Sequence, residues 1–438
     1  MIMKAIKSRL ILMNFLQFAV WGSYLTSMGG YLFAKGEGDL IGWFYAMQGI
    51  VSIFMPAIMG IIADKWMPAQ RLLGLCHAIA AIFIAAAGYF ASSDMILPMF
   101  ILYSISVAFY MPTLALSNSV AYTSLEMGGY DIVKAFPPIR VFGTVGFIVA
   151  MLICDFAGFQ ASHIQFYQCA LIGMGMALFT LLLPHCPVSK NMGNKSLIQR
   201  LGLDAFKLFK SKQMALFFIF SMLLGVSLQI TNGFANGFIT SFKNLPEFAN
   251  TFGANHANAL ISLSQVSETL CILLIPICLK RLGIKKVMLI AMFAWVLRFG
   301  LFGLGNPGGG LWMFILSMIV YGVAFDFFNV SGSLYVNENT SGEMRSSAQG
   351  LFMIMTNGIG ATVGTLGAQA VVNRFVPTAV ENACSLCSAP VVTNGNAIAE
   401  GWSETWLIFA GYALVVALLF WVLFRYKHNP NQMVDIKH

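Results

Sequence analysis

The sequence predicts an all-α integral membrane protein with twelve transmembrane helices in two six-helix bundles, and three observations favour this class. Of its 438 residues, 58% are hydrophobic and only 10% are charged, whereas soluble proteins carry about 25% charged residues. The mean hydropathy is +0.78. The apolar runs are continuous, as in FFIFSMLLGVSLQI at 217–230, whereas a membrane β-barrel alternates apolar and polar residues.

Twelve stretches are long enough to cross a bilayer, which requires about 20 apolar residues of helix. The first has a basic lead like that of a signal peptide. Its apolar run is longer than twenty residues, however, and YLFAKGEG is a poor cleavage site, so we expect a retained helix. The predicted helices, in chain order, span 10–33, 40–63, 71–92, 95–119, 137–158, 164–184, 213–240, 255–279, 284–304, 309–336, 346–373 and 403–425.

Positive charges predict the orientation, because cytoplasmic loops of membrane proteins are enriched in Lys and Arg. With both termini inside, 20 of the 25 Lys and Arg residues fall in inner segments, and only Lys35, Lys243 and Arg374 fall in outer loops. Arg140 and Arg298 lie inside predicted helices. The inner face therefore accounts for the net charge of +8, and no nucleic-acid partner is needed to explain it.

The longest and most basic inner connection divides the helices six and six. We predict an N-terminal six-helix bundle at 1–187, a cytoplasmic linker at 188–212 and a C-terminal six-helix bundle at 213–438. Within the linker, LIQRLGLDAFKLF at 197–209 is typical of an amphipathic helix on the membrane surface. In carriers built from two such halves, the substrate site lies near the middle of the bilayer. Polar residues at that depth are therefore the candidates for a site.

The fifth predicted helix begins PPIRVFGTVGF and carries an arginine in its apolar run. Arg140, Thr144 and Phe147 are spaced i, i+4 and i+7, so they share one helix face. The arginine either snorkels to the inner membrane surface or reaches into a cavity as a fixed cation beside a hydroxyl and a ring. We take these three residues as candidate site residues.

The seventh predicted helix, LQITNGFANGF, gathers three amides on one face: Gln229, Asn232 and Asn236. Such amides either join helices by hydrogen bonds or bind a ligand. We favour a ligand for Gln229 and Asn232.

The eighth predicted helix, SLSQVSETL, places Gln265 and Glu268 at i and i+3. A carboxylate inside an apolar run is costly and indicates a function. The alternative is a structural ion pair with an arginine of another helix, such as Arg140 or Arg298.

The tenth predicted helix, YGVAFDFFNVSG, places Asp326 among phenylalanines that include Phe325. Burial favours the neutral form of the acid. Asp326 could therefore bind and release a proton as it moves between an apolar and an aqueous environment. The competing interpretation is a salt bridge to a buried arginine.

Two further helices carry polar residues whose role stays open. In the first, Asn14, Gln17, Trp21 and Tyr24 recur at helical spacing, and they either line a pore or form a packing face. In the ninth, Arg298 has no polar neighbour in its own helix, so we expect a structural partner elsewhere.

Templates for catalysis and for ATP use are missing from the sequence. The six histidines are scattered without the spacing of a metal site. There is no G-x-S-x-G motif and no P-loop. We therefore expect a protein that is not an enzyme, that has no cofactor and that is driven either by an ion gradient or by no energy source at all.

The candidate residues suggest the chemistry of a ligand. Amides can pair with the donor and acceptor edge of a base, and rings such as Phe147 or Phe325 can stack on its face. The remaining polar groups suit sugar hydroxyls. A plain sugar would also satisfy the amides, but it would make less use of the rings.

Several motifs in chain order resemble the bacterial nucleoside:proton symporter family, the nucleoside permeases of the major facilitator superfamily. The short basic connections GIIADKWMPAQR and LKRLGIKK also resemble the loop signature of that superfamily. The family resemblance runs along nearly the whole chain and rests on FLQFAVWGSYLTSMGGYLF, FMPAIMGIIADKW, DIVKAFPPIRVFGTVGFI, FFIFSMLLGVSLQITN, SQVSETL, SMIVYGVAFDFFNVSGS, SAQGLFMIMTNG and WLIFAGY.

This resemblance implies proton-coupled import of purine and pyrimidine nucleosides, such as uridine and adenosine, across the bacterial inner membrane. It implies Asp326 as the proton-coupling acid, and we add Glu268 because two nearby carboxylates can titrate as a coupled pair. The remaining open alternatives are a proton-coupled sugar or glycoside symporter of the same fold and a facilitator or receptor that does not pump. A monomer needs no further assumption. Carried over by position, the substrate-binding residues are Arg140, Thr144, Phe147, Gln229, Asn232, Gln265, Glu268, Phe325 and Asp326.

The outer loop at 374–402 departs from the family, because it is longer than expected. It contains CSLC, in which Cys384 and Cys387 could form a disulfide in an oxidising compartment, whereas half a zinc site is disfavoured because the loop has no His. No role in transport is expected for this loop.

Overall fold

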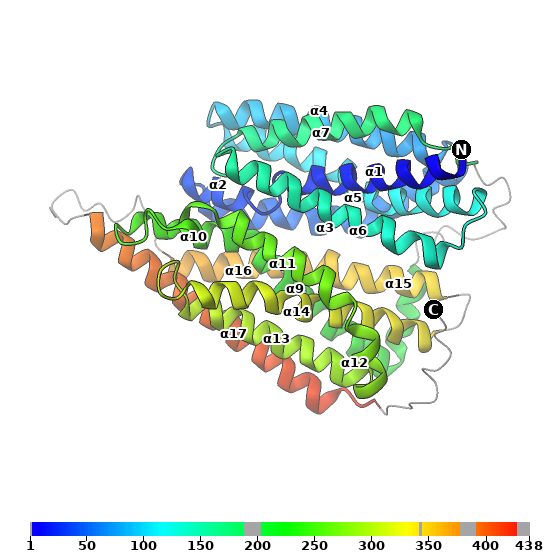
Figure 1. Cartoon of the computed structure of the whole chain (residues 1–438). Helices are drawn as coiled ribbons and strands as arrows, with labels where there is room; N and C mark the ends of the chain where they lie inside the picture. The colour runs from blue at the N-terminus through cyan, green and yellow to red at the C-terminus, as the bar shows by residue number, and fades with distance from the viewer. Residues whose placement is uncertain (1, 188–202, 341–343, 377–390, 427–438) are drawn as a thin grey trace. The chain divides into compact units, whose positions relative to one another are not determined.

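The computed structural model describes residues 2–187, 203–340, 344–376 and 391–426. Across these ranges the chain is helical and contains no strand (Figure 1). Contacts divide it into two compact units. The first comprises Met1–Leu25 and Met47–Asp204, and the second comprises Thr26–Ala46 and Ala205–Lys437.

The first unit is built from five helices and the larger part of a sixth, α3. Helix α4 packs between α5 and α7, and α1 packs along α6. The helices are α1 (Ile2–Gly22), α3 (Ile41–Lys65), α4 (Ala69–Ser92), α5 (Ile96–Met127), α6 (Ile132–Phe156) and α7 (Ile164–Phe179), followed by a 3₁₀ turn at Thr180–Leu182.

In the second unit, helix α14 packs between α11 and α13, and α13 packs on α17. The short segments η1 (Gly38–Leu40), η3 (Leu203–Lys210) and η4 (Phe242–Asn244) are 3₁₀ turns, and Ile354–Gly360 is a π-helical turn. The α-helices are α2 (Met28–Ala34), α9 (Lys212–Ser241), α10 (Phe252–Asn255), α11 (Ala257–Ile272), α12 (Ile275–Leu282), α13 (Ile284–Leu304), α14 (Leu311–Glu338), α15 (Arg345–Met353), α16 (Ala361–Phe375) and α17 (Val391–Leu423).

Glycine permits a close helix contact in each unit, because small residues let two backbones approach. A methyl group on Gly146 of α6 would lie 2.1 Å from the carbonyl oxygen of Phe15 in α1. A methyl group on Gly322 of α14 would lie 2.6 Å from the carbonyl oxygen of Ser267 in α11. These two contacts join the helix pairs that carry most of the predicted site residues.

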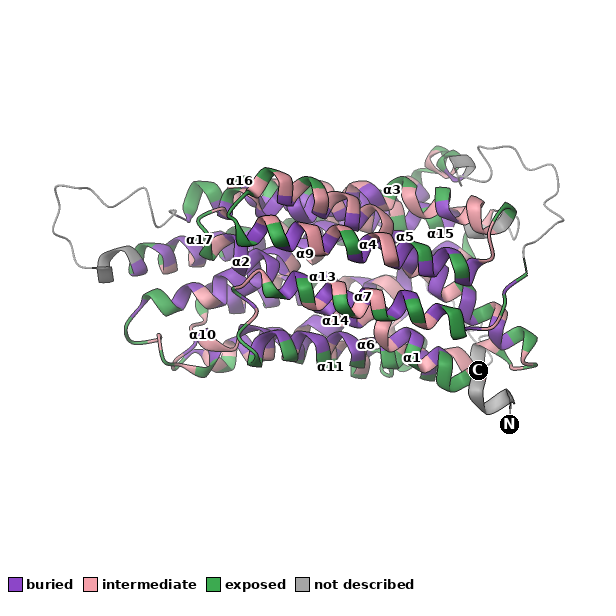
Figure 2. Cartoon of the chain, turned by 90° about the horizontal axis from the view of Figure 1, so that it is seen from above, coloured by how far each residue is buried: buried purple, intermediate pink, exposed green. Residues whose placement is uncertain are grey.

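The predicted membrane class is confirmed. Ten helices in the described ranges are long and apolar enough to span a bilayer, and an eleventh span is added if α11 and α12 count as one bent segment. The remaining predicted stretch corresponds to α1 and α2. Many large apolar side chains are exposed, among them Leu171, Leu181 and Leu273 (77%, 77% and 71%). Figure 2 shows exposed and buried residues alternating along the same helices, as expected for helices with one face toward lipid.

Two predicted helices are interrupted. The stretch 10–33 was predicted as one helix, which is wrong, because α1 ends at Gly22 and α2 begins at Met28. Here the hydroxyl of Thr26 donates to the side-chain oxygen of Asn258 (3.1 Å). The stretch 255–279 bends by 55° between α11 and α12. Proline stands in the first turn of α12, and it cannot donate a backbone hydrogen bond to the preceding turn.

Two predicted segments lie partly or wholly outside the described residues. These are most of the linker, at 188–202, and the part of the outer loop that holds Cys384 and Cys387. Of the predicted amphipathic helix at 197–209, the described end forms η3. The predicted bundle and linker boundaries stay a prediction.

Candidate functional site

In the first unit, the predicted face of α6 lies against α1. The guanidinium of Arg140 lies 3.9 Å from the ring centre of Phe18, so a cation–π contact fixes one end of this face. Phe147 is buried (6% exposed) and meets the ring of Trp21 edge-on, with centroids 6.5 Å apart. Thr144, which lies between Arg140 and Phe147 in the sequence, is half-buried. The face thus combines a cation, a hydroxyl and a ring on one helix.

Gln17 of α1 belongs to a packing network rather than to an open surface. Its amide nitrogen donates to the hydroxyl of Thr113 (2.7 Å), and its side-chain oxygen is 2.8 Å from Nε2 of His77. Because an amide oxygen only accepts, His77 must carry its proton on Nε2. The hydroxyl of Tyr110 donates to the backbone oxygen of Gln17 (2.8 Å). Both side-chain atoms of Gln17 are therefore used to hold α1 against α4 and α5.

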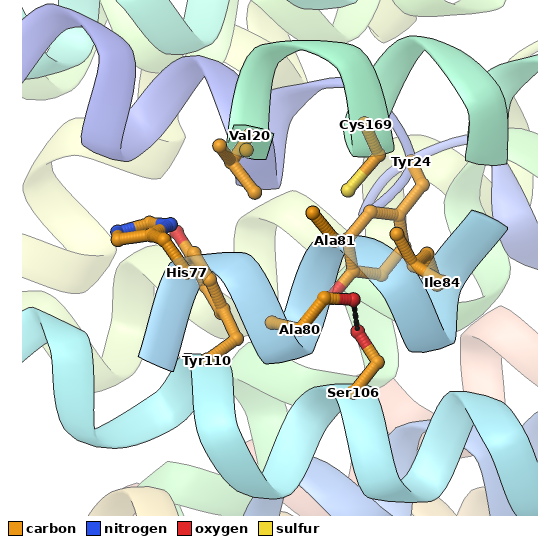
Figure 3. A pocket seen from close by; sticks show the side chains of 10 residues that line it. Val20, Tyr24, His77, Ala80, Ala81, Ile84, Ser106, Tyr110 and Cys169 are labelled. Carbon is orange, nitrogen blue, oxygen red and sulfur yellow. Dashed lines mark hydrogen bonds between the residues drawn. The ribbon is translucent and has the colours of Figure 1, made fainter. Parts of the chain in front are cut away.

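A small cavity lies beside this network, between α1, α4, α5 and α7 (Figure 3). Figure 3 shows His77, Tyr110 and Cys169 around it, and Ser106 donating to the backbone oxygen of Ala80 (2.8 Å). The space has room for about one water molecule. It contains none of the predicted substrate-binding residues and is too small for an organic ligand.

In the second unit, the three predicted amides of α9 have different environments. Asn236 donates to the side-chain oxygen of Asn258 (2.8 Å), so it joins α9 to α11. Gln229 is buried (7% exposed) and Asn232 is half-buried. Their side chains make a long contact with each other, from Nδ2 to Oε1 (3.4 Å). The interhelical interpretation thus holds for Asn236, and Gln229 and Asn232 form a separate amide pair.

Helices α11 and α14 bring two carboxylates together. Asp326 is 4% exposed, and its Oδ2 has no hydrogen-bond partner. It interacts electrostatically with Glu268 of α11, which is half-buried. Leaving a buried polar atom unpaired costs free energy, so the carboxylate of Asp326 lowers the stability of the fold.

Arg298 is not the partner that the salt-bridge interpretation requires for Asp326. Its Nη1 donates to the backbone oxygen of Ser317 (2.6 Å). No ion pair joins Arg298 to an acid in the part of the chain that the structure describes. The structural partner expected for Arg298 is therefore a backbone carbonyl of α14.

Tyr321 is a further member of the α11–α14 cluster that the sequence analysis missed. Its ring stacks on Phe325, with centroids 5.7 Å apart and planes 6° from parallel. Its hydroxyl lies beside Gln265 and within electrostatic range of Glu268 and Asp326. The signal was present in the sequence, because Tyr321 and Phe325 are spaced i, i+4 on one helix face.

The predicted residues thus fall into three groups. Gln265, Glu268, Phe325 and Asp326 meet at α11 and α14 of the second unit, and Gln229 and Asn232 are paired on α9 of the same unit. Arg140, Thr144 and Phe147 share α6 of the first unit. Among the described residues, no cluster of His, Cys, Asp and Glu could hold a metal ion.

Comparison with known proteins gives a consistent result along the chain. The model of the nucleoside H⁺ symporter family matches residues 3–429. The chain is 46% identical over 426 residues to the nucleoside permease NupG of Escherichia coli (strain K12), covering 97% of both chains. It is 45% identical over 437 residues to the xanthosine permease of the same organism, covering 99% of both.

Solved structures agree with these relatives. A crystal structure of a mutant of the nucleoside transporter NupG aligns with a TM-score of 0.88 at 46% identity, covering 96% of this chain and 100% of that one. A bacterial homologue of the human lysosomal transporter Spinster aligns with a TM-score of 0.70 at 13% identity, covering 97% of both chains, which supports the fold alone. The chain is a multi-pass membrane protein with the major facilitator fold, and it belongs to the nucleoside H⁺ symporter family.

Proposed function

We propose that this protein imports purine and pyrimidine nucleosides together with protons, by alternating access across the bacterial inner membrane. The observation that carries the proposal is the buried carboxylate of Asp326, whose Oδ2 is unpaired beside Glu268 and the Tyr321–Phe325 stack. A carboxylate buried inside a membrane-spanning helix indicates a function. Membership of a nucleoside H⁺ symporter family supports proton coupling as that function.

Recognition of the nucleoside is assigned to rings and amides. We assign stacking on the base to Phe325 of α14, which is half-buried, and to Phe147 of α6, which a base reaches only if its buried ring is uncovered. Gln229, Asn232 and Gln265 offer donors and acceptors for the base edge and the ribose hydroxyls. The relatives named above, a nucleoside permease and a xanthosine permease, support a nucleoside over the sugar alternative.

The fixed cation of Arg140 and the hydroxyl of Thr144 complete the proposed recognition set. The half-buried guanidinium holds its place over Phe18, so it can donate hydrogen bonds without first being ordered. A preorganised donor binds a ligand at a lower entropy cost than a mobile one. We assign Arg140 and Thr144 to the polar groups of the nucleoside.

Coupling is assigned to Asp326, with Glu268 as its electrostatic neighbour. When a carboxylate oxygen takes a proton, one negative charge is removed from an apolar environment, and the cost of enclosing the group falls. Release of that proton on the cytoplasmic side restores the charge. Since two nearby carboxylates titrate as a pair, the proton belongs to the Asp326–Glu268 pair rather than to a single oxygen.

The remaining proposals concern the setting. We place both termini in the cytoplasm, because of the distribution of Lys and Arg. The protein acts as a monomer and as a transporter rather than an enzyme. It uses the proton as coupling ion, with no further cofactor and no nucleic-acid partner.

The test is uptake of labelled uridine into cells that lack their own nucleoside carriers, with and without an imposed inward proton gradient. Accumulation that follows the gradient supports the symporter. Uptake that merely equalises the two sides would indicate a facilitator instead. Competition by free ribose equal to that by unlabelled uridine would favour the sugar symporter.

A further inference from the structure

Arg298 of α13 is a buried cation without a described acidic partner. It is 1% exposed, and removing a charged group from water is unfavourable unless other groups replace the water. Its neighbours are neutral: the backbone oxygen of Ser317 (2.6 Å), the hydroxyl of Ser264 (3.5 Å) and the sulfur of Met318 (3.9 Å). Its Nε has no hydrogen-bond partner. Stability alone does not account for such a residue, since a well-packed apolar side chain is often no worse.

The guanidinium also lies over two aromatic rings. Its central carbon is 4.7 Å from the ring centre of Tyr321 and 5.0 Å from that of Phe302. A cation–π contact is stronger when both groups are removed from water, as they are here. Arginine suits this position because its flat group can stack on a ring and donate hydrogen bonds in its own plane.

Arg298 of α13 and Ser317 of α14 bond to each other's backbone, which fixes the position of one helix along the other. Nη1 of Arg298 donates to the backbone oxygen of Ser317, and the hydroxyl of Ser317 donates to the backbone oxygen of Arg298 (3.0 Å). Ser317, Tyr321 and Phe325 follow each other at intervals of four on one face of α14. Arg298 therefore holds this face at Ser317 and again at Tyr321, one turn before Phe325.

Tyr321 transmits this constraint to the candidate site. Its ring is buried between the guanidinium, the edge of Trp295 (centroids 6.0 Å apart, planes at 90°) and the parallel ring of Phe325. Phe325 itself is half-buried, with part of its surface open to contact. A rotation of the Tyr321 ring would remove the surface on which Phe325 stacks.

We propose that Arg298 is a positioning residue for nucleoside binding, which acts by holding Tyr321, and through it Phe325, in the orientation that stacks on the base. This inference rests on the proposed function, because it assumes that Phe325 meets the nucleoside. Arg298 itself contacts no substrate in this proposal.

The main test is Arg298→Met, which keeps an unbranched apolar stem and removes the planar cation. We expect the KM for uridine uptake to rise about tenfold, while the protein still accumulates uridine with the proton gradient because Asp326 is unchanged. The matched control is Phe302→Leu, which removes the other ring under the guanidinium and disturbs the same helix. It should lower thermal stability and leave the KM unchanged.

A double-mutant cycle separates positioning from general damage. If Arg298 acts through Tyr321, adding Arg298→Met to Tyr321→Leu should raise the KM no further. Two effects that multiply would overturn the proposal. If Arg298→Met does not fold, Arg298→Lys keeps a charge but loses the planar group, and a KM equal to that of the wild type would contradict the proposal equally.

Uptake by the wild-type protein separates a failure of the proposed function from a failure of the role proposed for Arg298. If it takes up no uridine, the proposed function fails, and the inference fails with it. If it takes up uridine and the Arg298 variants have the wild-type KM, only the inference fails.

Discussion

Two buried polar side chains, one in each unit, are held in opposite ways. In the first, both side-chain atoms of Gln17 have partners, in Thr113 and His77. In the second, Asp326 is equally enclosed, yet its Oδ2 has none. A paired amide contributes to stability, whereas an unpaired buried carboxylate costs stability. The comparison separates polar residues that hold helices together from polar residues that we assign to transport.

The largest effect is expected where the unpaired acid is made neutral. Asp326→Asn keeps the size and polarity of the side chain but cannot ionise. We expect the protein to lose accumulation of uridine above the outside concentration in cells with an imposed proton gradient. Gradient-driven accumulation at the wild-type level in this variant would remove Asp326 from the coupling mechanism.

Asp155 provides the matched control for that variant. It is also buried (3% exposed), but its Oδ1 accepts a hydrogen bond from Gln160 (2.9 Å). Asp155→Asn should therefore keep proton-driven accumulation. A loss as large as that of Asp326→Asn would show that any buried acid matters, and the comparison would not hold.

The next largest effect is expected at the aromatic surface beside Asp326. Phe325→Leu should raise the KM for uridine about tenfold, because stacking of a base on a ring contributes about 1–3 kcal/mol. Phe328→Leu is the control on the same helix, since Phe328 is buried against Phe352 (centroids 6.4 Å apart). Equal changes of KM in both variants would argue against a specific role of Phe325.

The smallest effect on transport is expected at the satisfied amide. Gln17→Leu leaves Thr113 and His77 without their partner, which should lower the free energy of unfolding by about 1–3 kcal/mol. The KM for uridine should stay at the wild-type value. Thermal unfolding of the purified protein in detergent measures the first quantity, and a raised KM in folded protein would place Gln17 in the binding site after all.

The sequence predicted the membrane-spanning helices well, because a long apolar run is enough to identify a helix that crosses a bilayer. The stretches 40–63 and 284–304 correspond closely to α3 and α13. It failed at the interruption between α1 and α2, where Thr26 bonds to Asn258, more than two hundred residues away in the chain. A distant partner of this kind has no local signal, so the predicted continuous helix at 10–33 was the natural outcome.

The candidate site was only partly predictable, for a related reason. Spacing places Gln265 and Glu268 on one helix face, but it does not say which helix that face meets. The contact of α11 with α14 at Gly322 therefore had to come from the structure. Tyr321 escaped notice because an aromatic residue in a membrane helix is common. The partner of Arg298 escaped notice because backbone carbonyls carry no sequence signal.

The most direct test of the central claim is proton movement caused by nucleoside in a purified system. The protein would be reconstituted into vesicles that enclose a pH-sensitive dye, and uridine would be added outside without any imposed gradient. The account predicts that the vesicle interior becomes acidic as uridine enters with protons. It also predicts that the Asp326→Asn variant causes no such change. Entry of labelled uridine into wild-type vesicles without acidification would contradict proton coupling at Asp326.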